Sequence, residues 1–241
     1  MHNIYNKMTT NNLKKISDMG FNHDSKLKCD IDNRYCLAVF CVPNINDTYF
    51  TETFYELQKM LSNENGTTYY IDNKNYFNCG TFHFTFMQQL SFNNYYDLDK
   101  DIIYKCYEIL NNILNKYLPF KIYFDKCIAV TNGFVLCSTN SSININDLRD
   151  EYRYECKKNN LPLIEPYYLD IIHSTLFRFT DKLTLEESRD FLNKYKYYLE
   201  NDLDYGYIVI SHLNIGSATW KVNENEIKID HTIKNDSTDS T

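Results

Sequence analysis

Two short segments of this chain alternate large apolar residues with polar ones, and each carries a histidine followed two residues later by a threonine. The first is Thr81-Phe-His83-Phe-Thr85-Phe-Met87, and the second is Ile171-Ile-His173-Ser-Thr175-Leu-Phe177. Successive side chains of a β-strand point to opposite faces, so this alternation predicts two strands with one apolar face each. A fold that contains both strands must bury the two apolar faces, and it leaves two faces that present an imidazole beside a hydroxyl.

Helical and strand patterns are mixed along the rest of the chain, in two roughly comparable halves. Short apolar or alternating runs predict strands, and apolar residues at helical spacing predict helices. The expected strands are 35–42, 77–90, 120–130, 134–139, 168–179 and 207–213, with a closing hairpin over 218–222 and 227–233. The expected helices are 48–61, 97–118, 145–158 and 185–200. Asn132-Gly133 is a strong hairpin signal. This order predicts an α+β fold built from two facing lobes.

The chain has 241 residues, enough for one large domain with a sizeable core. Residues 1–30 are polar and weakly periodic, which predicts a flexible N-terminal lead-in. Residues 31–233 are expected to form a single bilobal domain, and the polar residues 234–241 a disordered tail. The boundary between the lobes is expected between the 120–139 hairpin and Pro162.

Charge and cysteine content restrict the partners and the compartment. The net charge is −7, and no basic stripe is visible. Because binding of long nucleic acid depends on neutralised phosphates, a small nucleotide or short RNA is a better candidate partner than a long duplex. The eight cysteines form no CxxC pair, which is typical of reduced thiols in a cytoplasmic protein. No apolar run reaches the roughly 20 residues that span a bilayer, so we expect a soluble monomer with no membrane partner.

The two histidines supply the chemistry that a phosphodiester requires. Cleavage needs a base for the oxygen nucleophile and an acid for the leaving oxygen, and imidazoles serve both roles near neutral pH. We expect His83 and His173 to be catalytic, and Thr85 and Thr175 to donate hydrogen bonds to non-bridging phosphate oxygens. This chemistry requires neither a metal nor a cofactor. The sequence does not indicate which histidine is the acid and which is the base.

Both His-x-Thr elements, with the apolar strand residues after them, resemble the motifs of the two-histidine (2H) phosphoesterase superfamily, which includes LigT-like and cyclic phosphodiesterase-like enzymes. The element order is similar from about Tyr35 to Ile233. By resemblance, His83 and Thr85 correspond to the first motif and His173 and Thr175 to the second. The resemblance implies two antiparallel-sheet lobes with outer helices around a central cleft, no cofactor, and substrates such as RNA 2′,3′-cyclic phosphates or 2′,5′-linked or cyclic oligonucleotides.

Three further residues are candidates for the lining of the cleft. Phe177 follows Thr175 on the histidine face, Trp220 could stack on a base, and Tyr168 could contact a phosphate. A buried core position is the simpler interpretation of Trp220. Arg178 is another possible phosphate contact, but strand alternation turns it away from this face.

Two alternatives of a different kind remain open. The chain could be a non-catalytic nucleotide- or RNA-binding module that retains the cleft, although both motifs keep their histidines and threonines. It could also be a metal-dependent hydrolase that uses the same histidines. Turnover in the presence of EDTA separates the three hypotheses.

Overall fold

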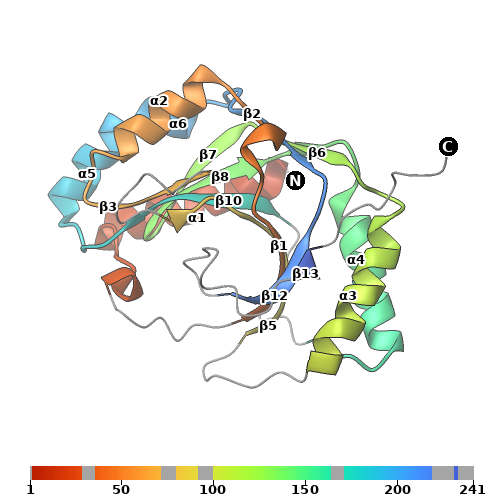
Figure 1. Cartoon of the computed structure of the whole chain (residues 1–241). Helices are drawn as coiled ribbons and strands as arrows, with labels where there is room; N and C mark the ends of the chain where they lie inside the picture. The colour runs from red at the N-terminus through yellow and green to blue at the C-terminus, as the bar shows by residue number, and fades with distance from the viewer. Residues whose placement is uncertain are drawn as a thin grey trace.

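The computed structural model describes residues 2–28, 36–71, 80–91, 100–163, 171–218 and 231–232, and it confirms a mixed α+β fold (Figure 1). The helices are α1 His2–Met19, α2 Glu52–Leu61, α3 Lys100–Leu114, α4 Ile145–Lys158, α5 Leu185–Lys194 and α6 Lys196–Glu200, with short 3-10 turns η1 Ser25–Lys28 and η2 Ile45–Asp47. The strands are β1 Cys36–Cys41, β2 Thr48–Phe50, β3 Gly66–Tyr70, β4 Gly80–Thr81, β5 Phe84–Ser91, β6 Phe120–Phe124, β7 Lys126–Val130, β8 Gly133–Ser138, β9 Asn140–Ser141, β10 Ile172–Phe179, β11 Gly206–Ile210, β12 Asn214–Ala218 and β13 His231–Thr232.

The described strands form two sheets. The larger follows the order β13-β12-β1-β5-β10-β3-β4, and β8 also pairs with β10 and carries β7. The smaller follows the order β2-β11-β6-β9. In the larger sheet β5 and β10 share a single bridging pair, Ser174 with Phe84. This bridge joins two halves, one with β1, β5, β12 and β13 and one with β3, β4, β7, β8 and β10. The two expected lobes are thus continuous through the strands that carry the two motifs.

Helices α2 to α6 gather at opposite ends of the larger sheet. Helices α3 and α4 contact each other beside the β1–β5 half, and α2, α5 and α6 lie at the far side, near β3 (Figure 1). Helix α4 occupies the range predicted from the sequence. Its N-cap Asn144 accepts a hydrogen bond from Asn146 N, and its last turn holds Lys157 and Lys158, which favours the end of a helix.

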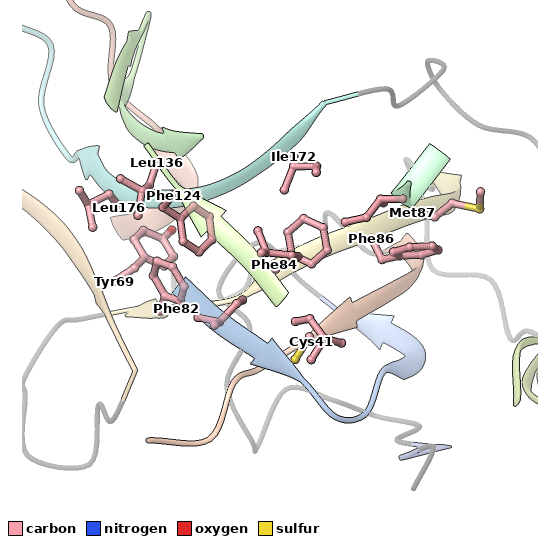
Figure 2. Packing of buried hydrophobic residues seen from close by; sticks show 14 of the residues in the cluster. Cys41, Tyr69, Phe82, Phe84, Phe86, Met87, Phe124, Leu136, Ile172 and Leu176 are labelled. Carbon is pink, nitrogen blue, oxygen red and sulfur yellow. The ribbon is translucent and has the colours of Figure 1, made fainter. Parts of the chain in front are cut away.

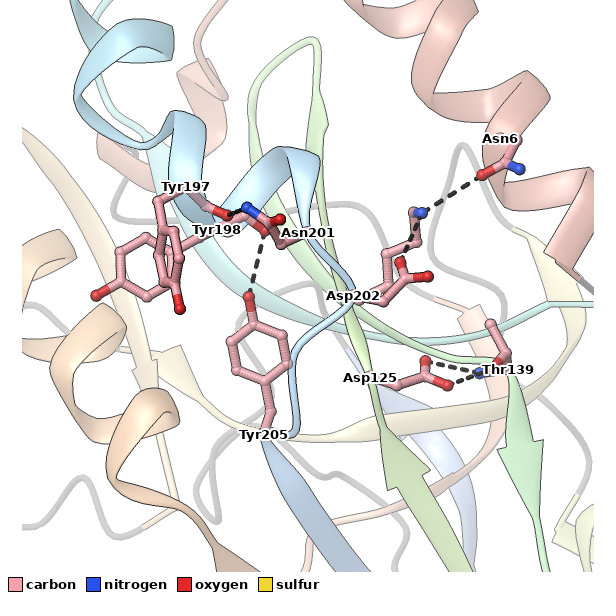
Figure 3. A network of polar contacts seen from close by, with 9 residues as sticks. Asn6, Asp125, Thr139, Tyr197, Tyr198, Asn201, Asp202 and Tyr205 are labelled. Atoms are coloured by element: carbon pink, nitrogen blue, oxygen red, sulfur yellow. Dashed lines mark hydrogen bonds and ion pairs between the residues drawn. The ribbon is translucent and has the colours of Figure 1, made fainter.

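The hairpin from 120 to 141 passes from one sheet to the other. The predicted strand 120–130 is two strands, because β6 belongs to the smaller sheet and β7 to the larger one. Asp125 and Thr139 lie at the two corners, and the Asp125 carboxylate accepts hydrogen bonds from Thr139 N, at 3.0 Å, and from Thr139 Oγ1 (Figure 3). The turn between β7 and β8 is Thr131-Asn132, and Gly133 is already the first residue of β8.

The structure differs from the sequence expectation for the N-terminal segment. Residues 2–19 form helix α1, which contacts β7 and α5, where a flexible lead-in was predicted. Its buried residues include Tyr5 and Ile16, and Asn6 accepts a hydrogen bond from Lys126, which also pairs with Asp202 (Figure 3). The many polar residues of this segment occupy the exposed face, so their number conceals a helix with one packed side.

One apolar core underlies both halves of the larger sheet. The side chains of Phe82, Phe84 and Phe86 are fully buried, as the alternation predicts, and Ile172 and Leu176 of β10 belong to the same cluster (Figure 2). Burial of such aromatic side chains stabilises a fold by roughly 1.5–3 kcal/mol each. The opposite side of these strands is therefore fixed as the side that carries the histidines.

The predicted tail, 234–241, lies outside the described residues, and so does the central part of the closing hairpin. Of the two predicted hairpin strands, the described residues are Ala218, at the end of β12, and 231–232, which form β13. β12 pairs with β13 through Asn214–Thr232 and Ile215–His231.

Candidate active site

The two His-x-Thr motifs lie side by side and run in opposite directions. The bridge between Ser174 and Phe84 fixes their register. One residue further in each direction, His83 lies across from Thr175, and Thr85 lies across from His173. In a regular antiparallel ladder, residues directly opposite have Cβ atoms about 5 Å apart and diagonal neighbours about 7–8 Å. Here a single bridge fixes the register, and these values give only the scale of the separations. The four side chains thus form the corners of a quadrilateral, with the histidines on one diagonal and the threonines on the other.

All four side chains share one face of the sheet. His83, Thr85, His173 and Thr175 are partly exposed, whereas Phe84, Ser174 and the other residues that alternate with them are buried. The buried Ser174 hydroxyl donates a 2.5 Å hydrogen bond to the His83 carbonyl and ties the second motif to the first. The two motif strands, one from each half of the larger sheet, are therefore adjacent strands of one sheet. Neither histidine lies in the core.

His83 lies in the short connection between strands β4 and β5 rather than inside a strand. Strand β4 pairs with β3, whereas β5 pairs with β1 and β10, so the chain changes partners across Phe82 and His83. This connection lets the His83 ring turn back to Thr81, whose carbonyl accepts a 2.9 Å hydrogen bond from Nδ1. Because a carbonyl only accepts, the neutral ring carries its proton on Nδ1, and Nε2 keeps a free lone pair.

The pKa of His83 is lowered mainly by burial and in part by the positive charge of Arg178. The hydrogen bond to Thr81 acts against this shift because the protonated ring also donates it. The ring also packs near Tyr69, with centroids 6.3 Å apart. The result is an oriented, uncharged imidazole near neutral pH.

His173 lies inside β10, between β8 and β5. Its Nδ1 is buried and has no hydrogen-bond partner among the residues that the structure describes. Burial lowers its pKa to about 4, with further contributions from Arg178, Arg149 and His83. Without a bond that favours the protonated ring, His173 is held more firmly in its neutral form than His83 is.

The surroundings of the quadrilateral suit an anion. No hydrogen bond from Thr85 or Thr175 Oγ1 to another group is present within the described part of the chain, so both hydroxyls can donate to a ligand. The positive charge of Arg178 acts on both imidazoles, and that of Arg149 acts on His173. A phosphate placed over this face would meet two hydroxyls, two imidazoles and a positive potential.

Phe177 is not a cleft residue, contrary to the sequence expectation. Its ring is fully buried and packs edge-on against Phe179 at 5.0 Å and near Phe191 at 6.2 Å. The cause is a β-bulge, because the pairing of β10 with β8 skips Leu176, so that Thr175 faces Val135 and Phe177 faces Phe134. An extra residue in one strand shifts the alternation by one position.

The same bulge changes the place of Arg178, which alternation alone turned away. Beyond Phe177 the alternation resumes with Arg178 on the side of His173 and Thr175. Arg178 is 8% exposed and donates a hydrogen bond through Nη1 to the side chain of Asn132. The sequence holds one indirect sign of the bulge, Gly133, where a Cβ would collide with the Phe177 carbonyl.

Helix α1 is a part of the site region that the sequence interpretation missed. His173 pairs with Cys137 and Thr175 with Val135, so these four side chains share a face. Val135 and Cys137 form an apolar cluster with Tyr5 of α1 and Ile128. Helix α1 therefore covers the sheet beside the second motif. The spacing of Tyr5, Met8 and Ile16 was the available signal, and it is weak among so many polar residues.

Trp220 and Tyr168, the other candidate cleft residues, lie outside the described residues. Among the described residues, no group of three or more His, Cys, Asp or Glu side chains is placed to hold a metal ion. No described helix combines the length and apolar character needed to cross a membrane.

Comparison with known proteins gives structural likenesses at low identity. The chain is similar to a solved structure described as a phosphoesterase, with 10% identity, a TM-score of 0.42, and coverage of 83% of this chain and 94% of the other. It is also similar to Escherichia coli LigT in a complex with ATP, with 10% identity, a TM-score of 0.42, and coverage of 84% and 98%. No family model matches the sequence, and no curated protein matches it. Likenesses of this size assign neither a family nor an activity.

Proposed function

We propose that this protein is a metal-independent phosphodiesterase that hydrolyses an RNA-type phosphodiester, either a 2′,3′-cyclic phosphate or a 2′,5′-linked or cyclic oligonucleotide. One observation carries the proposal. His83, Thr175, Thr85 and His173 occupy the corners of one quadrilateral on a single face, with the two imidazoles diagonally opposed. With the spacing of a regular antiparallel ladder this diagonal is about 7–8 Å, which leaves room for one phosphate with an imidazole on each side.

The hydrogen bond at Thr81 favours His83 as the base. It fixes the neutral tautomer that leaves Nε2 free to accept a proton from the nucleophile. For a cyclic phosphate the nucleophile is water. For a 2′,5′ linkage the neighbouring 3′-hydroxyl is a second option.

His173 then serves as the acid. Its low pKa in the free protein arises mainly from burial and partly from nearby cations, and an anionic phosphate beside the ring raises that pKa. Substrate binding thus draws the required proton onto His173, which passes it to the departing ribose oxygen. Thr85 and Thr175 donate to the non-bridging oxygens, whose negative charge increases in the transition state.

The charge of the chain favours a small substrate. A net charge of −7 opposes the binding of long polyanions, whereas the positive potential beside the histidines acts at short range. We expect cyclic mononucleotides and short 2′,5′-linked oligonucleotides to be turned over faster than long RNA.

The test is a panel of 2′,3′-cyclic nucleotides and 2′,5′-linked dinucleotides, assayed with EDTA present. We expect wild-type turnover, and losses of about 100- to 10,000-fold in His83→Ala and in His173→Ala, the usual range for a general acid or base. Melting curves monitor the fold, and His212→Ala is the matched histidine control. His212 lies between β11 and β12 and belongs to neither motif.

Three results contradict the proposal in different ways. Nucleotide binding without turnover indicates a binding module. Turnover that EDTA removes and a divalent metal restores indicates a metal-dependent hydrolase. Full activity in either histidine variant removes that residue from the mechanism.

A further inference from the structure

A buried arginine lies behind the two motifs, on the apolar side of the sheet. Arg149 extends from α4, and its side chain is fully buried. Nε donates to the Phe86 carbonyl at 2.8 Å, and Nη2 donates to the Ile171 carbonyl at 2.9 Å. Nη1 donates to the Asn146 side chain at 3.0 Å, one turn earlier in the same helix. The guanidinium therefore bonds to the backbone of both motif segments at once.

These two carbonyls lie where β5 and β10 separate. The strands share the Ser174–Phe84 bridge, and the same register would next pair Phe86 with Ile172. No such pair is formed among the described strands, because β5 continues along β1 and β10 along β8. The guanidinium replaces hydrogen bonds that the two strands do not make with each other. Its N–H donors lie in one plane and point in different directions, so it can bond to two carbonyls on separated strands.

The two Arg149 hydrogen bonds lie next to two residues of the candidate site. Between the bridge and these hydrogen bonds lie Thr85 on β5 and His173 on β10, which face each other on the opposite side of the sheet. The opening of the two strands at this point sets the separation of those two side chains. The Phe86 ring, whose centroid is 5.5 Å from the guanidinium carbon, supports the cation from the apolar side.

We propose that Arg149 is a positioning residue, whose guanidinium sets the spacing of Thr85 and His173 by holding β5 and β10 at a fixed opening. The inference rests on the proposed function, since it assigns the spacing that the reaction uses. Arg149 does not touch the substrate, and it acts through the two strands. Its charge has a second effect, since together with Arg178 and His83 it lowers the pKa of His173.

Substitutions at Arg149 separate spacing from charge. Arg149→Met removes the two backbone hydrogen bonds and the charge, whereas Arg149→Lys keeps a charge but cannot bridge two carbonyls in the same geometry. We expect kcat to fall about 100-fold in Arg149→Met and at least 10-fold in Arg149→Lys, with KM changed less, as for a misplacement of about 1 Å. Nuclear magnetic resonance should show the His173 pKa raised in Arg149→Met and retained in Arg149→Lys. Arg153→Met, on the same helix and paired with Asp150, is the control.

If Arg149→Met fails to fold, Arg149→Ala with added ethylguanidinium takes its place, and restored kcat supports the proposal. Spacing is also measured without turnover, through the nuclear Overhauser contact between Thr85 and His173, which should weaken while the Phe84–Ser174 contact persists. Wild type that turns over no phosphodiester refutes the proposed function, and this contact then decides the Arg149 proposal alone. A folded Arg149→Met with an unchanged Thr85–His173 contact, or with wild-type kcat in an active enzyme, overturns it.

Discussion

The two motifs have the same sequence pattern but are held in different ways. His83 lies at a break between β4 and β5, and its ring is oriented by a bond to Thr81 two residues earlier. His173 lies inside β10, with paired strands on both sides and no partner on Nδ1. The His83 imidazole is oriented by a hydrogen bond to a residue close by in the sequence, whereas the His173 imidazole is placed by the paired strands on both sides of β10.

This difference changes how strongly each imidazole binds a proton. A ring that donates to a carbonyl keeps part of its affinity for a proton, so burial lowers the pKa of His83 against an opposing contribution. His173 has no opposing contribution, and its pKa falls to about 4. Two residues with one motif can thus take opposite roles, since their surroundings separate their protonation behaviour.

The largest expected effect on stability is its dependence on pH. His173 titrates near 6.5 in the unfolded chain and near 4 in the folded protein, so in that interval the unfolded chain binds more protons. Its contribution is present above pH 6.5 and is lost as the pH falls to about 4. The free energy of unfolding should fall by on the order of 3 kcal/mol from this residue, as measured by urea unfolding at several pH values.

His173→Gln should flatten this decrease, and His83→Gln should flatten it less, because the Thr81 bond offsets part of the shift at His83. An equal effect of the two substitutions would contradict the contrast between the motifs. A decrease that is unchanged in both variants would show that neither imidazole is held neutral by the fold.

The next effect concerns the support of the second motif by α1. The Tyr5 hydroxyl accepts from Ile172 N at 2.7 Å and lies within hydrogen-bond distance of the carbonyls of Ser138 and Ile172, at 2.9 and 2.8 Å. Tyr5→Phe leaves these buried groups without the hydroxyl, which costs about 2 kcal/mol of stability. Because Ile172 precedes His173, kcat should also fall, as measured by urea unfolding and turnover.

Tyr55→Phe, at an exposed position of α2, is the matched control and should change neither quantity. If Tyr5→Phe lowers stability but leaves kcat unchanged, α1 supports the fold without positioning His173. If the His83 resonances shift more than those of His173, the assignment of α1 to the second motif is wrong.

The sequence predicted the helices and strands whose residue pattern is compatible with a single type of secondary structure. Helix α4 was predicted at its observed bounds, and β1 and β8 within one residue at each end. The alternation around Phe84 and Ser174 also placed both His-x-Thr pairs on the side away from the core. These predictions depend only on side-chain periodicity, which a single strand or helix expresses by itself.

The missed features depend on contacts between distant segments. The bulge that buries Phe177 requires Gly133 of another strand to make room, and the hydrogen bonds of Arg149 require two carbonyls from segments 85 residues apart, at 86 and 171. In a polar helix such as α1, the buried face can be recognised only when the segments that pack against it are known. Periodicity carries no information on such partners, so it could not predict that the two motif strands are adjacent in one sheet.

The smallest expected effect tests the bridge between the motifs. Ser174 is 1% exposed, and its hydroxyl donates to the His83 carbonyl, so Ser174→Ala leaves that carbonyl without this donor and should cost about 1 kcal/mol. Ser188, equally buried and bonded to Phe21 N and Thr184 O, is the control, and Ser188→Ala should cost a similar amount.

The two variants should differ in turnover, measured at equal folded fraction. Only Ser174→Ala removes a hydrogen bond to the His83 backbone. Because local hydrogen bonds orient the His83 imidazole, kcat should fall in that variant alone. Equal kcat in both would mean that the Thr81 bond suffices to orient His83, and that the first motif does not depend on the second.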